Sequence, residues 1–144
     1  MKKLFAIFAA ALIAFGMSSC KKTNGNEPEP EKEPATIEIQ IDGVAADKVY
    51  YNIIPSDLET RIFFNVVVQA VADGREDADL IAEAKEMSDA ELSGHVWTGE
   101  IRNAVIVNLV PNVDYVMYAF YFDKNKNVPA GTKVVRANFK TAAE

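Results

Sequence analysis

The 144-residue chain contains only one cysteine, one histidine and one tryptophan. A single cysteine excludes an intramolecular disulfide and a cysteine-based zinc site within one chain, and a single histidine excludes the metal sites that need paired histidines. Basic residues are also few, because 15 Lys and Arg face 21 Asp and Glu, which gives a formal net charge of −6. Neutralising nucleic-acid phosphates takes an excess of Lys and Arg, so the composition argues against a nucleic-acid partner.

The chain also lacks an apolar run long enough to cross a bilayer. Its longest uncharged apolar run, residues 4–15, has twelve residues, whereas a transmembrane helix needs roughly 20. Two lysines precede this run, and two serines and Cys20 follow shortly after it. A positive start, a short apolar stretch and small residues before a cleavage point are typical of a secretion signal. We therefore predict a signal peptide over residues 1–20.

The single cysteine stands at the end of this predicted signal. Met17-Ser18-Ser19-Cys20 resembles the lipobox of bacterial lipoproteins, with Met17 where leucine is commoner. The resemblance implies cleavage before Cys20 and lipidation of its thiol and amine. Several acyl chains make a stable membrane anchor, since each buried methylene contributes about 0.8 kcal/mol. We therefore expect the protein in the cell envelope, lipid-anchored at the outer membrane, on its periplasmic face or at the cell surface.

Residues 21–35 have the composition of a tether. Prolines alternate with glutamates in this stretch, and no apolar side chain there would support a core. Proline favours the extended polyproline II conformation and the carboxylates repel one another, so the segment would reach about 45 Å at full stretch. The remaining residues, 36–144, have the length of one domain.

Six segments of this domain have the pattern of β-strands. They alternate polar and apolar residues or are rich in β-branched and aromatic ones, and turn residues bound them. The segments are residues 36–42, 48–54, 61–71, 102–110, 113–123 and 132–141. Strands at this spacing predict a mainly β fold, a small antiparallel β-sandwich of the immunoglobulin type.

A helical insert interrupts the strands over residues 73–94. Its apolar residues follow the stripe of an α-helix, namely Leu80, Ile81, Ala84 and Met87. Ser88 and Glu91 form a capping-box pattern, which predicts a second short helix over residues 89–93. The stretch from Asp73 to Glu91 holds eight acidic and two basic residues, so most of the domain's negative charge belongs to the insert. We interpret this charge as a solvated helix face.

The fifth predicted strand is apolar on both faces. One face carries Tyr115, Met117, Ala119 and Tyr121, and the other carries Val116, Tyr118, Phe120 and Phe122. In a sheet with one solvent-exposed face, only the residues on the buried face need to be apolar. We therefore predict that the helical insert packs on the second face. With a solvated insert, three aromatic residues would instead form an exposed partner-binding patch, Tyr118, Phe120 and Phe122.

A family resemblance appears at the start of this strand. Leu109, Pro111 and Tyr115 match the L-x-P-x-x-x-Y pattern of fibronectin type III domains, in which Tyr115 would be the tyrosine-corner residue. The domain as a whole resembles the fibronectin-III-like domains of Gram-negative envelope lipoproteins, which carry a helical insertion after the third strand. The second strand lacks the family's tryptophan, so Tyr50 or Tyr51 would take that place. The resemblance implies a fold and not an activity.

Few other residues suggest a catalytic or metal-binding site. Residues 123–127 imitate the start of an EF-hand loop, but Val128 and Val134 stand where the loop needs Gly and Glu. We interpret them as a polar hairpin loop. His95 has no patterned Ser or Asp partner for catalysis, and we expect it near the surface where the insert ends.

Trp97 leaves two roles open, stacking on a sugar or partner protein, or filling the junction between the insert and the fourth strand. The sequence as a whole predicts a lipid-anchored envelope protein without catalytic activity, cofactor or metal, which acts by binding or as a spacer. One alternative is a carbohydrate- or peptide-binding module that uses Trp97 and the aromatic strand face. Another is a small hydrolase or an enzyme inhibitor.

Overall fold

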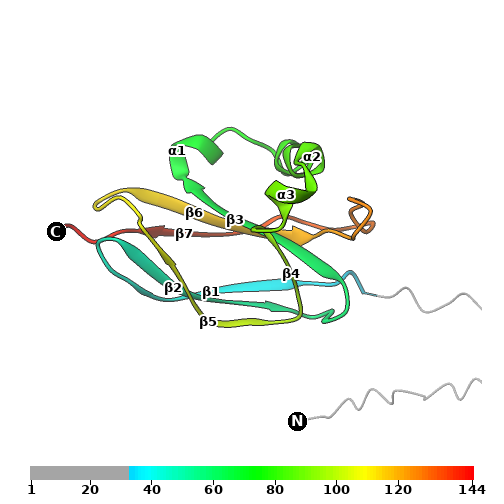
Figure 1. Cartoon of the computed structure of the whole chain (residues 1–144), viewed down its shortest axis with the longest axis horizontal. Coiled ribbons are helices and arrows are strands. Elements are labelled where there is room, and N and C mark those ends of the chain that lie inside the picture. Colours follow the sequence, from blue (N-terminus) through cyan, green and yellow to red (C-terminus); the bar gives the residue numbers. More distant parts are fainter. Residues whose placement is uncertain (1–32) are drawn as a thin grey trace, which may run out of the picture. The chain divides into compact units, whose positions relative to one another are not determined.

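The computed structural model describes residues 33–144, so the predicted signal peptide, Cys20 and most of the tether lie outside the described residues. The described part is a two-layer antiparallel β-sandwich (Figure 1), which confirms the predicted fold class. One sheet has the order β1-β2-β5 and consists of β1 (Ile37–Val44), β2 (Lys48–Pro55) and β5 (Ile101–Val107). The other has the order β4-β3-β6-β7 and consists of β4 (Val96–Thr98), β3 (Arg61–Val68), β6 (Asp114–Tyr121) and β7 (Val135–Lys140).

Three helices lie between β3 and β4, where the sequence predicts an insert. They are α1 (Gln69–Ala72), α2 (Asp77–Glu86) and α3 (Asp89–Leu92). The predicted capping box of the second helix is present, because the Ser88 hydroxyl accepts a hydrogen bond from the Glu91 amide and the Glu91 carboxylate accepts one from the Ser88 amide. A reciprocal pair between Glu76 and Asp79 caps α2 in the same way.

Some strand boundaries differ from those predicted. The third strand ends at Val68, which pairs with Tyr115 near the start of β6, rather than at residue 71. The chain turns into α1 instead. The fourth predicted strand ends at Val107, and Asn108 has a left-handed φ of 62°. Strand β4 has no counterpart among the six predicted strands, since its three residues are too few for a periodicity to appear.

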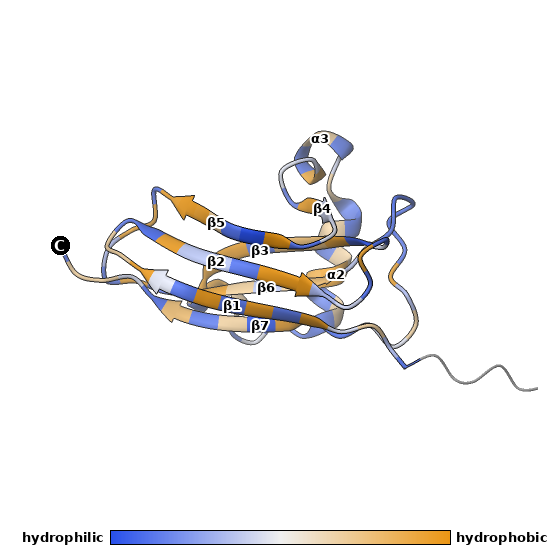
Figure 2. Ribbon diagram, turned by 90° about the horizontal axis from the view of Figure 1, so that it is seen from below, coloured by the Kyte–Doolittle hydropathy of each residue, from blue (hydrophilic) through white to orange (hydrophobic). Residues whose placement is uncertain are grey.

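The core between the sheets is built from alternating residues of facing strands. Its buried members include Val49, Tyr51 and Ile53 of β2, Ile62 of β3, and Tyr115, Met117, Ala119 and Tyr121 of β6. Alternation with period two sends these residues to one side of each sheet. In the three-stranded sheet the opposite side stays open, and no described helix covers it (Figure 2).

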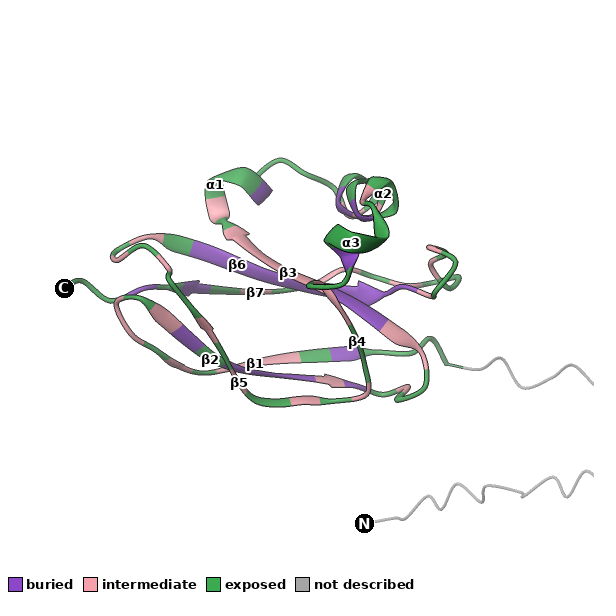
Figure 3. Ribbon diagram, viewed as in Figure 1, coloured by how far each residue is buried: buried purple, intermediate pink, exposed green. Residues whose placement is uncertain are grey.

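The four-stranded sheet is buried on both faces. Its outer face carries Phe63, Tyr118, Phe120 and Phe122, and these pack with Leu80 and Ala84 of α2 and Leu92 of α3. Figure 3 shows the buried residues of β6 and the inward sides of α2 and α3 facing one another. The predicted packing of the insert on this face is therefore confirmed.

The chain enters the sandwich at one end. The Tyr121 hydroxyl donates to the Thr36 carbonyl oxygen at 2.9 Å and accepts from the Asp57 amide at 3.0 Å, which fixes the start of β1. We call this the entry end. The far end holds the β1–β2 turn, α1, the loop between β5 and β6, and the last residues of β7.

Packing of the insert predicts the effect of truncating Leu80, which is 1% exposed. Leu80→Ala should lower the free energy of unfolding by about 2–5 kcal/mol, because it leaves a cavity over the aromatic face. Val71→Ala on α1, at a side chain that is 49% exposed, should change it by about 0.5 kcal/mol at most. Urea denaturation measures both values. Equal costs for the two variants would show that α2 does not pack on the sheet.

Candidate functional site

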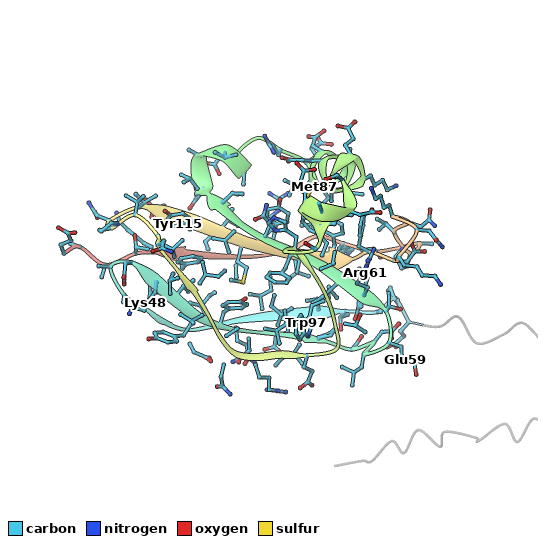
Figure 4. The ribbon with its side chains drawn as sticks, viewed as in Figure 1. Lys48, Glu59, Arg61, Met87, Trp97 and Tyr115 are labelled. Carbon is cyan, nitrogen blue, oxygen red and sulfur yellow. The ribbon has the colours of Figure 1, made fainter. Side chains whose placement is uncertain are left out.

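Trp97 lies on β4, an edge strand of the four-stranded sheet, and is 54% exposed. It pairs with Ile62 of β3, whose side chain is buried between the sheets. Directly opposed residues share a face, so the indole lies on the core side of the sheet but at its open flank. Figure 4 shows it where β4 descends towards β5. An indole that is 54% exposed fills the junction between the insert and the fourth predicted strand only in part, and a role in recognition stays a prediction.

The residue before Trp97 holds the short strand in place. Val96 pairs with Phe63 and packs on the cluster under the insert. Successive strand residues point to opposite faces, so burial of Val96 directs Trp97 away from the insert. The Phe64 amide also donates to the His95 carbonyl oxygen at 2.8 Å, which extends the connection to β3. The indole is thus presented from a fixed backbone.

The aromatic patch named as a candidate binding site is not exposed. Tyr118 is 2% exposed, and Phe120 and Phe122 are fully buried under α2 and α3. Burial raises the pKa of the Tyr118 phenol, and the Asn65 side-chain amide donates to its hydroxyl at 3.4 Å. A partner could reach these rings only if the insert moved away, so in this structure they belong to the core.

The side of the insert nearest β7 is held by Asp77, the first residue of α2. One of its carboxylate oxygens accepts from the Val134 amide at 3.1 Å, and the other accepts from the Arg136 guanidinium at 3.0 Å. The same guanidinium also donates to the Arg75 carbonyl oxygen at 3.1 Å. A carboxylate in the first turn of a helix is favourable for the helix dipole. Asp77 therefore both stabilises α2 and fixes it to the sheet.

A second link joins the end of α2 to the loop between β6 and β7. The Lys126 ammonium donates to the carbonyl oxygen of Met87, the C-cap residue of α2, at 2.6 Å and lies 3.6 Å from the Asp89 carboxylate. Cations are favoured at helix C-termini, where carbonyl groups lack intrahelical partners. The acidic insert is thus held at both ends of α2 by basic residues of the sandwich.

His95 lies where the insert ends, as predicted, and has packing partners. Its ring stacks on Phe63 with centroids 5.6 Å apart, and its Nδ1 atom lies 3.2 Å from the Phe64 carbonyl oxygen. Both contacts tie β4 to β3. Among residues 33–144, no three His, Cys, Asp or Glu side chains gather in a way that would hold a metal ion.

The EF-hand-like stretch forms a closed polar turn. The Asp123 carboxylate accepts from the Asn125 amide at 2.7 Å and the Asn127 amide at 2.8 Å. Hydrogen bonds from the Asn127 backbone hold the pKa of Asp123 below its ordinary value, because they stabilise the ionised form. The carboxylate thus organises the hairpin loop that carries Lys126.

Tyr115 lies at the start of β6 and is 6% exposed. Its hydroxyl accepts from the Val110 amide at 3.0 Å, five residues upstream, and its ring stacks on Phe139 with centroids 5.6 Å apart. A hydroxyl bonded back to the upstream backbone is the defining contact of a tyrosine corner.

The open face of the three-stranded sheet contains a polar group that the sequence did not reveal. Asn52, which is 8% exposed, donates to the Asp42 carboxylate at 2.6 Å and accepts from the Asn103 amide at 2.7 Å. Asn103 has a left-handed φ of 49° and lies where the β2–β5 register shifts. The Asn52 side chain therefore accepts a hydrogen bond from the backbone of the bulged strand β5. Only knowledge of the strand pairing would have indicated this role.

Searches of protein-family models, of curated proteins and of solved structures find no match to this chain. Within the described residues, no helix is both long enough and apolar enough to cross a membrane. The candidate sites therefore rest on the geometry of the sandwich and on the N-terminal sequence.

The Asp123 loop predicts a pH dependence with a definite sign. Since the folded-state pKa is depressed, the carboxylate stabilises the fold above its ordinary pKa of about 4, and this contribution is lost as the pH falls through the lower folded value. Asp123→Asn should therefore be less stable than the parent chain at neutral pH, and the gap should close in acid.

Thermal unfolding of both proteins at a series of pH values measures that gap. Asp47→Asn is a suitable control, because the Asp47 carboxylate contacts only Lys48, at 3.8 Å on the surface. A gap between Asp123→Asn and the parent that stayed constant into acid would contradict the assigned role of the ionised carboxylate.

Proposed function

We propose that the protein is a lipid-anchored lipoprotein of the cell envelope, whose fibronectin-III-like domain acts without catalysis as a tethered binding or spacer module. The observation that carries this proposal is the N-terminal sequence, in which a charged start and a short apolar run end at Ser18-Ser19-Cys20. A Pro- and Glu-rich stretch then separates the proposed anchor from the sandwich.

Two features of the sandwich support the family part of the proposal. Seven strands in sheets of three and four are the number found in immunoglobulin-like constant-type sandwiches, and Tyr115 makes the tyrosine-corner contact. Tyr51 is 5% exposed and lies 6.4 Å from Phe64 between their ring centroids. This burial supports Tyr51, rather than the exposed Tyr50, as the residue in place of the family's tryptophan in the second strand.

The chain entry supports the role of a tethered module. The Tyr121 hydroxyl is hydrogen-bonded to Thr36 and Asp57 at the entry end, directly after the tether. The far end is formed by the other ends of the same strands. The tether is therefore continuous with a strand end that these hydrogen bonds fix, as a tethered module requires.

The exposure of Trp97 favours a more specific second candidate, a module that binds a glycan or an extended peptide. An indole combines a large apolar surface with one hydrogen-bond donor, and exposed tryptophans are frequent anchors in interfaces. The pairing of β4 with β3 and the packing of Val96 on the cluster under the insert hold the backbone at Trp97 before any partner arrives. Preorganisation of that kind lowers the entropic cost of binding.

Lipidation is tested by replacing Cys20 with alanine in cells of a Gram-negative host. We expect the parent chain to incorporate labelled palmitate and to fractionate with membranes, and Cys20→Ala to incorporate none. Thr23→Ala, three residues into the tether, is the matched control and should behave as the parent. Labelling of Cys20→Ala at the parental level would refute the lipid anchor. Protease treatment of intact cells then distinguishes surface display from the periplasmic face.

Recognition by Trp97 is tested with Trp97→Ala. Because the indole is about half exposed, the substitution should lower the free energy of unfolding by about 1 kcal/mol, whereas Phe120→Ala in the buried cluster should cost about 3–5 kcal/mol. A glycan array and an extended-peptide array should show binding by the parent chain and loss of that binding in Trp97→Ala. Binding that survives in Trp97→Ala, or a stability cost as large as that of Phe120→Ala, would contradict this second candidate.

A further inference from the structure

Each sheet of the sandwich ends in two edge strands, whose outer backbone groups have no strand partner within residues 33–144. The edges are β1 and β5 in the three-stranded sheet, and β4 and β7 in the four-stranded sheet. An unpaired edge can add a strand from another chain, and proteins commonly prevent this with short strands, charged side chains or bulges. The protection of each edge therefore indicates whether it is available to a partner.

Three of these edges are protected. β4 has only three residues. β1 carries Glu38 and Asp42, and its pairing with β2 shifts register next to Gly43. β7 carries Arg136 and Lys140. These edges have the features that discourage association.

The part of β3 that extends beyond β4 is protected in another way. The Phe64 amide donates to the His95 carbonyl oxygen on the β4 side, so the amide of Val66, two residues further on, points to that side as well. Beyond the end of β4 this amide would lack a partner, but it donates to the side-chain oxygen of Asn65 at 2.8 Å. A donor on this edge is thus already satisfied within the chain.

The second half of β5 has none of these protections. Arg102 and a register shift occur in its first half, whereas residues 103–110 contain no charged residue and no proline. Among the described residues, only β2 pairs with β5, so its other edge is free. Figure 2 shows β5 at the margin of its sheet, with hydrophobic residues at the end of the strand. An uncharged, β-branched edge of this kind favours pairing with another strand.

An exposed apolar row runs beside this free edge. Ala104 and Ile106 pack on the core between the sheets, so the alternating Val105 and Val107 lie on the opposite, outer face. They are 46% and 51% exposed. Tyr50 of β2 pairs with Val105 and is 45% exposed. The free edge and the apolar row therefore form one continuous surface, and a contiguous exposed patch is typical of an interaction site.

The sequence of the edge matches a second copy of itself. Val105 and Val107 flank Ile106 symmetrically, so an antiparallel copy centred on Ile106 would place Val105 opposite Val107 of the second copy. Directly opposed residues share a face, so valine would meet valine on the outer face and isoleucine would meet isoleucine on the core side. A two-fold dimer requires this kind of self-complementary surface.

The charge distribution also suits pairing of two copies through this edge. The charged residues of β2 and β5 are Lys48 and Arg102, which lie 3.8 Å from the Asp47 carboxylate and 2.6 Å from the Glu100 carboxylate. Most of the negative charge belongs to the insert, which packs on the outer face of the other sheet. Strand pairing at β5 therefore does not bring the acidic inserts face to face, where they would repel one another.

We propose that two copies of the chain form a two-fold dimer through the second half of β5, so that their three-stranded sheets join into one continuous sheet. Backbone hydrogen bonds between the two edges and contacts between the valines of the outer face stabilise the pair. Asn103 and Asn108 have left-handed φ values of 49° and 62°, and they limit the pairing to the residues between and beside them. This inference goes beyond the binding role proposed above, and its test involves neither the lipid anchor nor Trp97.

Disulfide cross-linking tests the register of the dimer. In the full-length Cys20→Ala chain, which has no cysteine left, one preparation carries Val105→Cys and a second, with a different affinity tag, carries Val107→Cys. Directly opposed Cα atoms lie about 4.5–5.5 Å apart, within reach of a disulfide, whereas diagonal neighbours lie about 7–8 Å apart. Oxidising the mixture in zwitterionic detergent should therefore give about tenfold more mixed dimer than either uniform dimer.

The matched control uses Glu38→Cys and Gln40→Cys, which have the same spacing on the outer face of the protected edge β1. Random collision gives about twice as much mixed dimer as each uniform dimer, and we expect no more than this ratio for the control pair. The random ratio for the β5 pair, an excess of a uniform dimer, or no cross-linked dimer at all would overturn the proposal.

Sedimentation velocity of the Cys20→Ala chain at about 100 μM then measures association without a covalent bond, because a dimer with a dissociation constant of that order is substantially populated. Val107→Glu should abolish the dimer, since it places a carboxylate among the paired valines. Its own Lys48 lies directly opposite in β2, so the monomer should stay folded, which thermal unfolding checks. Val71→Glu on α1 adds the same charge at a side chain that is 49% exposed and should leave association unchanged. A monomeric parent chain, or equal association of both variants, would overturn the dimer.

Discussion

The structure depends on the burial of the second face of the four-stranded sheet. Phe63, Phe120 and Phe122 on that face would be exposed in a bare sandwich, but Leu80 and Leu92 of the insert cover them. Each large side chain removed from water contributes about 1.5–3 kcal/mol, so the cover is a substantial part of the stability. The Asp77 and Lys126 contacts fix both ends of α2, and every buried side-chain polar atom of the described residues has a hydrogen-bond partner.

This cover decides which surfaces remain for a partner. It makes the aromatic face of β6 inaccessible to a partner and leaves the half-exposed indole of Trp97 at one flank of the sheet. The acidic insert between β3 and β4 serves as structure, because its apolar side is buried on the sheet.

Much of this architecture follows from local sequence patterns. The uninterrupted apolar run of β6 predicts that both faces of this strand are covered. The apolar stripe around Leu80 identifies the helical insert as the cover of the second face. Both patterns depend only on residue spacing. The exposure of Trp97 did not follow, since it depends on β4 being an outer strand of three residues. Helix α1 was also not predicted, because the pattern assigns residues 69–71 to a longer third strand.

The central claim, that the insert is an integral cover of the sheet, is tested most directly by native-state hydrogen exchange of the full chain. The account predicts that amides of α2 around Leu80 and Ala84 exchange with a free energy of opening close to that of the β6 amides, because both lose the same buried contacts when they open. Fast exchange throughout α2 beside slow exchange in β6 would contradict the account, since it would show a mobile insert over an intermittently exposed aromatic face.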